Sequence, residues 1–150
     1  MLRAMADLDV SVAETLSSLP MFKDLDEIGL WHVSELATVA ELESGHVLVQ
    51  PGQEGAGLFV IVKGTVNVEL GSTTIACSEG EFIGELSLLV DGLHHTGRVR
   101  ANGPVTALAL GRDDFIRVLD TYPQIAVSML KVLARRLAQT DEMLEAQQQQ

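Results

Sequence analysis

The sequence predicts a mainly β fold with flanking helices: a β-roll, which is a jelly-roll-like barrel, with an N-terminal helix and a long C-terminal helix. Twelve of the 13 glycines lie between Gly45 and Gly111. Between them lie short runs rich in valine, isoleucine and threonine, at 46–50, 58–64, 65–70, 73–77 and 105–111. Short strands joined by glycine turns are typical of an antiparallel roll or barrel. From residue 124 onward the chain contains neither glycine nor proline, which favours a long helix.

The segment before the roll, residues 1–22, is predicted to be a helical lead-in with a short helix at 11–18. A second helix follows, and Asp24 or Asp26 can serve as its N-cap, because a short acidic side chain there can accept a hydrogen bond from a backbone N–H group. The apolar residues of this second helix include Ile28, Trp31 and Leu36.

The roll is assigned to residues 23–122. Two turns are expected within it, at 50–52 and 102–104, because both contain adjacent proline and glycine. In the run 65–70, valines alternate with polar residues, so one face of that strand should point inward. After Gly111 a helix is expected, which ends near the next proline.

The long helix is assigned to residues 123–146, followed by a tail at 147–150. It carries two apolar stripes, and we expect one to pack on the roll while the other makes a homodimer through 126–144. A single broad face that covers the core is the alternative. The first stripe has the 4-3-4-3-4 spacing of a coiled-coil seam and consists of Ala126, Leu130, Leu133, Leu137, Thr140 and Leu144. The second stripe consists of Ile125, Met129 and Val132.

Composition excludes several classes of protein. The net charge of −11 disfavours a nucleic-acid partner, because binding phosphates requires a basic face. No apolar run approaches the roughly 20 residues that span a bilayer, so no membrane segment is expected. The opening residues lack the apolar stretch of a signal peptide. The single Cys77 predicts a packed, inert thiol in a reducing, cytoplasmic location.

The segment 82–101 has the residues that a cyclic phosphodiester requires, and we call it the cassette. Gly84 permits close backbone approach, and residues 86–89 can form a short helical turn whose N–H groups, at Leu86 and Ser87, face an anion. Glu85 can accept a hydrogen bond from a ribose 2′-hydroxyl. The alternatives are a solvated loop carboxylate at Glu85 and a simple capping role for Ser87.

The chain resembles a cyclic nucleotide-binding domain of the catabolite activator type, over residues 20–146. The resemblance rests on LPMFKDL, QPGQEG, LFVIVKGTVNV, GEFIGELSLL, VRA and LARRLAQTDEML in this sequence. It implies a β-roll with a helical lead-in, a cassette and a long final helix. It also implies that cyclic AMP, or alternatively cyclic GMP, is the ligand.

The resemblance assigns roles to individual residues. Gly84 and Glu85 lie where the family binds the ribose and phosphate. His95 and Thr96 occupy the positions of an arginine and a serine or threonine that pair with the phosphate. Thr140 matches a threonine that reaches the adenine amino group, in some members across a dimer. From the residues alone, Thr140 is either a solvated position near the helix end or a ligand contact.

The histidine at position 95 departs from the family pattern. Arginine is always charged and offers a two-pronged donor, whereas histidine has an ordinary pKa near 6.5 and is mostly neutral at pH 7. Strand alternation argues against Arg98 as a substitute, because Val99 and Ala101 should face the interior and Arg98 should face outward. A bulge at Gly97 would reverse that assignment.

Three functions follow from these observations. The first is a regulatory module that binds a cyclic nucleotide and relays the signal through the final helix to a dimer partner or effector. The second is a degenerate domain of the same fold, which binds another anion or nothing and serves as a dimerisation or interaction module. The third is a metal-dependent enzyme. The four histidines do not have the spacing of a metal-ligand set, so neither catalysis nor a bound metal is expected. No helix-turn-helix follows the long helix, so direct DNA binding is not expected.

Overall fold

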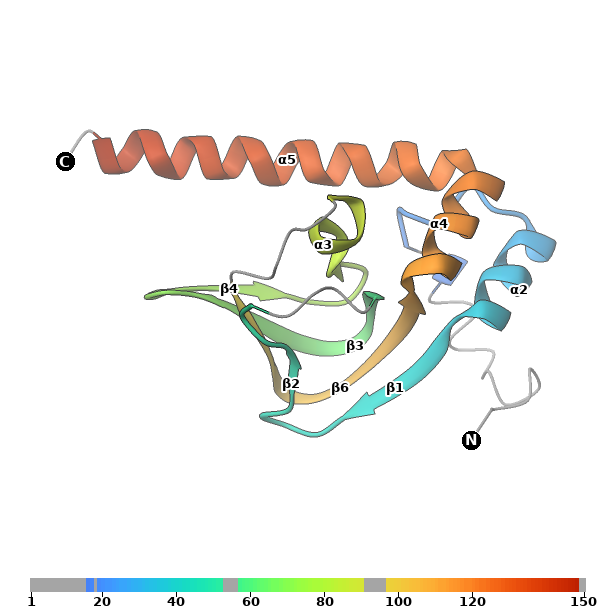
Figure 1. The fold of residues 1–150 in the computed structure, drawn as a ribbon, viewed down its shortest axis with the longest axis horizontal. Coiled ribbons are helices and arrows are strands. Elements are labelled where there is room, and N and C mark those ends of the chain that lie inside the picture. The colour runs from blue at the N-terminus through green and yellow to red at the C-terminus, as the bar shows by residue number, and fades with distance from the viewer. Residues whose placement is uncertain (1–15, 18, 53–56, 91–96, 149–150) are drawn as a thin grey trace.

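The computed structural model describes residues 16–17, 19–52, 57–90 and 97–148. Its described strands form one antiparallel sheet of six, with the order β1-β6-β3-β4, while β2 pairs with β6 and β5 pairs with β3. This arrangement confirms the predicted class, a β-roll with a helix before it and a long helix after it (Figure 1). The elements are α2 (Glu27–Leu36), β1 (Thr38–Leu42), β2 (Val47–Val49), β3 (Gly57–Leu70), β4 (Thr73–Cys77), β5 (Phe82–Ile83), α3 (Glu85–Leu89), β6 (Arg98–Gly111), α4 (Arg112–Thr121) and α5 (Pro123–Gln148).

The helices gather on one side of the curved sheet. Figure 1 shows α5 running across this side above α3, with α2 and α4 together at one end of the roll. The helix α5 continues through Gln148, two residues beyond the predicted bound of 146. Most of the predicted helix at 11–18 lies outside the described residues.

The apolar interior has two parts. One cluster lies inside the roll and includes Ile61, Val66, Val99 and Ala107. The other lies between the sheet and the helices, and there Phe115 and Ile125 are fully buried. This second cluster fixes α4 and α5 on the roll, because burying such side chains contributes about 1.5–3 kcal/mol each.

The helix α2, the second helix predicted from the sequence, begins as expected. The Asp26 side chain accepts a hydrogen bond from the Gly29 N–H at 2.8 Å, which makes Asp26 the N-cap rather than Asp24. The buried residues of α2 are Gly29 and Val33, whereas Ile28 and Trp31, which helped to predict the helix, are exposed.

Three strand predictions need correction. The runs 58–64 and 65–70 form one strand, β3, because β6 pairs with it on both sides of register shifts near Lys63. The turn expected at 102–104 is absent, since β6 continues through it. There Gly103 takes a φ of 91°, and its N–H donates to the Ser44 hydroxyl at 3.2 Å. The strand β1 was not predicted. The turn at 50–52 and the helix after Gly111 are present as expected.

Candidate functional site

The cassette is anchored to the sheet at its first residues. Phe82 and Ile83 form the short strand β5, which pairs with β3 at Val60 and Phe59. Both β5 side chains are buried. The polypeptide then turns at Gly84 directly into α3. The start of α3 is therefore held against β3.

Gly84 cannot be replaced without strain. Its φ is 95°, a left-handed conformation that glycine alone adopts at little cost. A Cβ built at this position would lie 2.5 Å from the carbonyl oxygen of Gly57 in β3. The glycine thus lets the cassette backbone cross β3 in close contact. The close approach to an anion that its residue type suggested stays a prediction.

Glu85 is a buried carboxylate. Only 6% of the residue is exposed, and it is the only buried charged residue among those the structure describes. Its Oε1 atom lies 2.9 Å from Nη1 of Arg136 in α5. Glu85 is therefore an ion-paired group inside the molecule and not a solvated loop carboxylate.

Arg136 connects the cassette to the long helix. Besides the Glu85 pair, its Nη2 donates to the Phe82 carbonyl at 2.7 Å. Its guanidinium carbon lies 4.5 Å from the centre of the Phe82 ring, an attractive cation–π contact. A single α5 side chain thus contacts two residues of the cassette.

Arg136 was not among the site residues predicted from the sequence. One signal could have found it. Arg136 lies four residues before Thr140, so both occupy the same face of the helix. Thr140 had already been singled out, and Arg136 has the longer side chain and the charge.

Thr140 itself is exposed, and its hydroxyl donates to the Arg136 carbonyl one turn earlier, at 3.0 Å. The backbone of Leu86 and Ser87 lies in α3, while their side chains are outside the described structure. His95 and Thr96 also lie outside the described residues.

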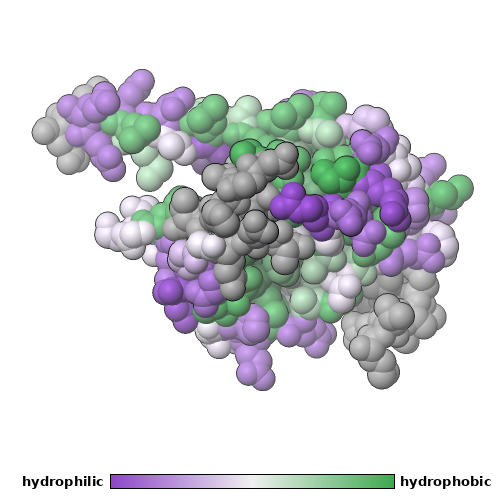
Figure 2. All heavy atoms as spheres, viewed as in Figure 1, coloured by the Kyte–Doolittle hydropathy of each residue, from purple (hydrophilic) through white to green (hydrophobic). Residues whose placement is uncertain are grey.

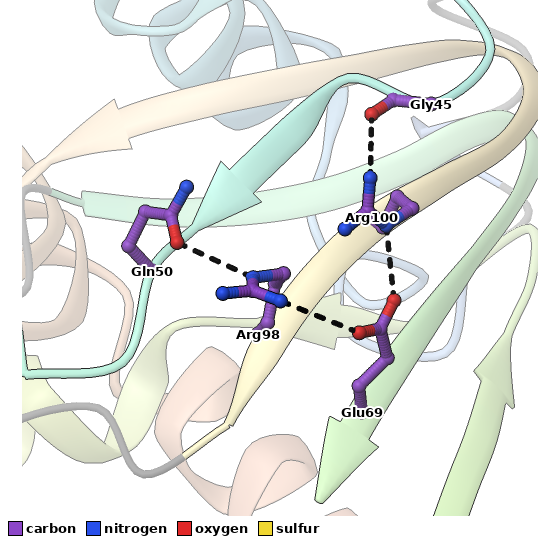
Figure 3. Close-up of polar contacts among 5 residues, drawn as sticks. All are labelled: Gly45, Gln50, Glu69, Arg98 and Arg100. Carbon is purple, nitrogen blue, oxygen red and sulfur yellow. Dashed lines mark hydrogen bonds and ion pairs between the residues drawn. The ribbon is translucent and has the colours of Figure 1, made fainter.

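The alternation expected around Arg98 is present. Val99 and Ala101 are buried, while Arg98 and Arg100 lie on the outer face. Figure 3 shows both guanidinium groups directed at Glu69 of β3, with Nε of Arg100 at 3.0 Å and Nη1 of Arg98 at 3.9 Å. The Nε of Arg98 also donates to the Gln50 amide oxygen at 3.3 Å. Arg98 is therefore engaged on the outside of the roll, which argues against a substitute role for it.

Other reactive groups have structural positions. Cys77 is buried, and burial, followed by the negative charge of Glu81, raises the pKa of its thiol. The thiol is therefore protonated and unreactive near neutral pH, as predicted. Among the described residues, no group of three or more His, Cys, Asp and Glu side chains could hold a metal ion. Across the same ranges, no helix is long and apolar enough to cross a membrane.

Comparison with known proteins places these features in a family. The model of the cyclic nucleotide-binding domain matches residues 39–122. The cAMP-dependent protein kinase regulatory subunit of Debaryomyces hansenii is 32% identical over 112 residues, which cover 73% of this chain and 25% of that protein. The cAMP-activated global transcriptional regulator CRP of Salmonella typhimurium is 30% identical over 118 residues, which cover 75% of this chain and 56% of that protein. The chain thus spans between a quarter and just over half of the length of these two relatives.

Solved structures agree with this placement. The crystal structure of the Thermus thermophilus catabolite activator protein has a TM-score of 0.73 and 26% identity, over 84% of this chain and 62% of that one. The N-terminal domain of a transcriptional regulator from Streptomyces coelicolor has a TM-score of 0.65 and 29% identity, over 87% of this chain and 94% of that one. With a family match across more than half of its length and this fold around Gly84 and Glu85, the chain belongs to the cyclic nucleotide-binding domain family.

Proposed function

We propose that this chain is a regulatory module that binds a cyclic nucleotide, cyclic AMP in the first place, in the cassette and relays the signal through α5. The observation that carries this proposal is the buried Glu85 carboxylate, which directly follows the left-handed Gly84 and is contacted from α5 by Arg136. A buried carboxylate is costly unless it is paired. Its position beside the glycine turn, at the start of α3, supports a binding role.

In the proposed complex, each residue has a distinct task. Gly84 and the N–H groups of Leu86 and Ser87 surround the cyclic phosphate. Glu85 accepts a hydrogen bond from the ribose 2′-hydroxyl. A carboxylate has about four acceptor positions, so lone pairs remain available beside its ion pair with Arg136. His95 and Thr96 approach the exocyclic phosphate oxygens. Thr140 contacts the base.

The relay follows from the double role of Arg136. This side chain is bonded to both Glu85 and Phe82 in the structure. A ligand that takes up part of the Glu85 carboxylate changes how firmly Arg136 is held. Because Arg136 belongs to α5, the position of the whole helix responds to the ligand, as expected when binding favours one of two conformations.

The signal passes to a second copy of the chain in a homodimer through 126–144, or to an effector that contacts the same surface. Ile125 and Met129 are buried on the roll, whereas Leu130, Leu137 and Leu144 are 63%, 63% and 51% exposed. Figure 2 shows apolar side chains gathered along the outer edge of α5. All described residues beyond Arg136 are exposed. A helical segment this short is marginal in water without a partner.

Titration calorimetry of cyclic AMP and cyclic GMP, at pH 6 and pH 7.5, tests the binding proposal. Micromolar binding of either ligand supports it, and the preferred base tests the role of Thr140. If neither ligand gives heat or raises the melting temperature, the binding proposal is wrong.

The second candidate is a degenerate domain that serves only as a dimerisation or interaction module. The histidine at position 95, in place of arginine, is the observation that favours it.

If His95 pairs with the phosphate, the affinity for the cyclic nucleotide should strengthen as pH falls from 8 to 6, because the imidazolium cation is the better partner. His95→Arg should then bind tighter and lose this pH dependence. Unchanged affinity in His95→Arg across that pH range would argue against a phosphate contact at this position.

Both candidates describe a regulatory or interaction module in the cytoplasm, without catalysis, a metal or direct DNA contact of its own. The effector is another domain or another protein. These parts of the proposal rest on the composition and on the absence of an assembled catalytic set in the sequence.

A further inference from the structure

The helix α2 carries apolar residues on two opposite sides. Gly29 and Val33 are buried against the rest of the molecule. On the other side, Trp31 is 45% exposed and Ile28 is 75% exposed, the highest value for a large apolar residue in the part of the chain that the structure describes. A surface helix ordinarily directs polar residues outward. The outer side of α2 therefore differs from that of a helix that only covers a core.

Two carboxylates lie on the same side as this apolar pair. Glu27, Trp31 and Glu35 follow one another at intervals of four residues, so the indole lies between two exposed glutamates on one side of the helix. Within the described ranges, neither glutamate takes part in an ion pair. We call Glu27, Ile28, Trp31 and Glu35 together the α2 face.

The stability of α2 does not explain the charge of Glu35. An acid in the first turn, such as Glu27, stabilises a helix, because the N-terminal end is partly positive. Glu35 lies in the last turn, where the partial negative charge of the helix end favours a cation instead. An exposed carboxylate beside an exposed indole suits an external arginine, which can stack on the ring and pair with the acid.

We propose that the α2 face is the docking surface for a basic segment of another protein. The partner places an apolar side chain on Ile28 and an arginine over Trp31, between Glu27 and Glu35. Charge complementarity selects this partner, because residues 23–35 contain four carboxylates and only one lysine. A second copy of this chain is disfavoured, since an α2-to-α2 contact would bring like charges together. An anionic lipid surface is disfavoured for the same reason.

The α2 face is fixed before any partner arrives. The N-cap Asp26 accepts the Gly29 N–H at 2.8 Å, and Val33 packs in the core with 1% exposure. A preformed surface loses little conformational entropy on binding, and tryptophan is among the residues that contribute most to interfaces. Figure 1 shows α2 at the opposite end of the molecule from the C-terminal end of α5. The inference therefore depends neither on nucleotide binding nor on a dimer through α5.

Tryptophan fluorescence of the whole chain tests the proposal, because Trp31 is the only tryptophan. The probe is a synthetic amphipathic helix of about 18 residues, or about five turns, with arginine on one face and leucine on the other. We expect a saturable shift of the emission to shorter wavelength, as the indole leaves water. The same peptide with glutamate in place of arginine should give no shift. No shift with the arginine peptide, or equal shifts with both peptides, would overturn the proposal.

Charge-removing substitutions locate the contact. Glu27→Gln combined with Glu35→Gln should weaken peptide binding by about threefold to tenfold, the range for losing two exposed ion pairs. Glu41→Gln combined with Glu43→Gln is the matched control, because it removes the same charge at two exposed positions in and just after β1. Equal weakening in both double variants would mean that the overall negative charge attracts the peptide, which would contradict docking at the α2 face.

A substitution at Ile28 tests the apolar part of the contact. Ile28→Ser should weaken peptide binding by about tenfold, because the partner can no longer bury the isoleucine side chain. Ile75→Ser, the same change at an exposed isoleucine of β4, is the control and should leave the affinity unchanged. If Ile28→Ser binds the peptide as tightly as the unaltered chain does, the proposed docking mode is wrong.

Discussion

At the scale of the residue, the site is built around one backbone conformation and one buried charge. Gly84 lets the chain approach Gly57 closely, and this contact brings Glu85 to the position where Arg136 reaches it. The sequence was sufficient to select Gly84 and Glu85 as candidates, because their types match the chemistry of a ribose phosphate. It was not sufficient for the partner of Glu85, because Arg136 is 51 positions away. Only the packing of α5 across the roll brings the two together.

Gly84→Ala should cost at least about 2 kcal/mol of unfolding free energy, since it adds both left-handed strain and a clash with the Gly57 carbonyl. Gly71→Ala is the control, because Gly71 has a φ of 61° and no atom within 4 Å of an added Cβ. It should cost only about 1 kcal/mol. Urea unfolding measures both. Equal losses would show that the close approach at Gly84 contributes nothing.

Arg136→Leu should destabilise the fold by about 2–3 kcal/mol, because it leaves the buried Glu85 carboxylate without its ion pair. The cost is below that of a fully buried pair, since the Arg136 side chain is 31% exposed. Arg135→Leu, at the neighbouring exposed position, should change stability by no more than about 0.5 kcal/mol. Urea unfolding at constant pH compares the two. Similar values would mean that the pair with Glu85 has no net effect.

At the scale of the element, the sequence predicted the helices better than the strands. The helix after Gly111 and the long final helix follow from proline and glycine positions, which limit helices directly. The strands β3 and β6 are longer than their sequence runs, because each continues through a glycine with positive φ, Gly64 in one and Gly103 in the other. Glycine marks a turn in isolation, but pairing along a neighbouring strand can absorb it as a bulge.

The exposed stripe of α5 leads to a prediction about assembly. Leu137→Glu should convert a dimer to a monomer in sedimentation velocity, because it places a charge in the middle of the apolar seam. Leu133 is a poorer choice, since it also packs against the core of the roll. Glu142→Gln, a charge change on an exposed residue outside the seam, is the control. A sedimentation coefficient that stays the same in Leu137→Glu would show that the seam makes no dimer.

At the scale of the whole molecule, two apolar clusters hold the elements together, and one polar link joins the cassette to α5. The cluster inside the roll keeps the sheet rigid, and the cluster under the helices holds α4 and α5. Between the cassette and α5, the Arg136 contacts provide a polar link, and the proposed relay requires that a ligand at Glu85 alters it. Glycine positions, apolar runs and element order were sufficient to predict the fold class. The link could not be predicted, because it depends on how α5 crosses the roll.

Hydrogen exchange of the whole chain, with and without saturating cyclic AMP, tests the central claim most directly. We expect slower exchange in the cassette, residues 82–101, and a change in α5 around Arg136 and beyond it. Protection of the cassette with unchanged α5 would contradict the relay. No change in either segment would contradict cyclic AMP binding itself.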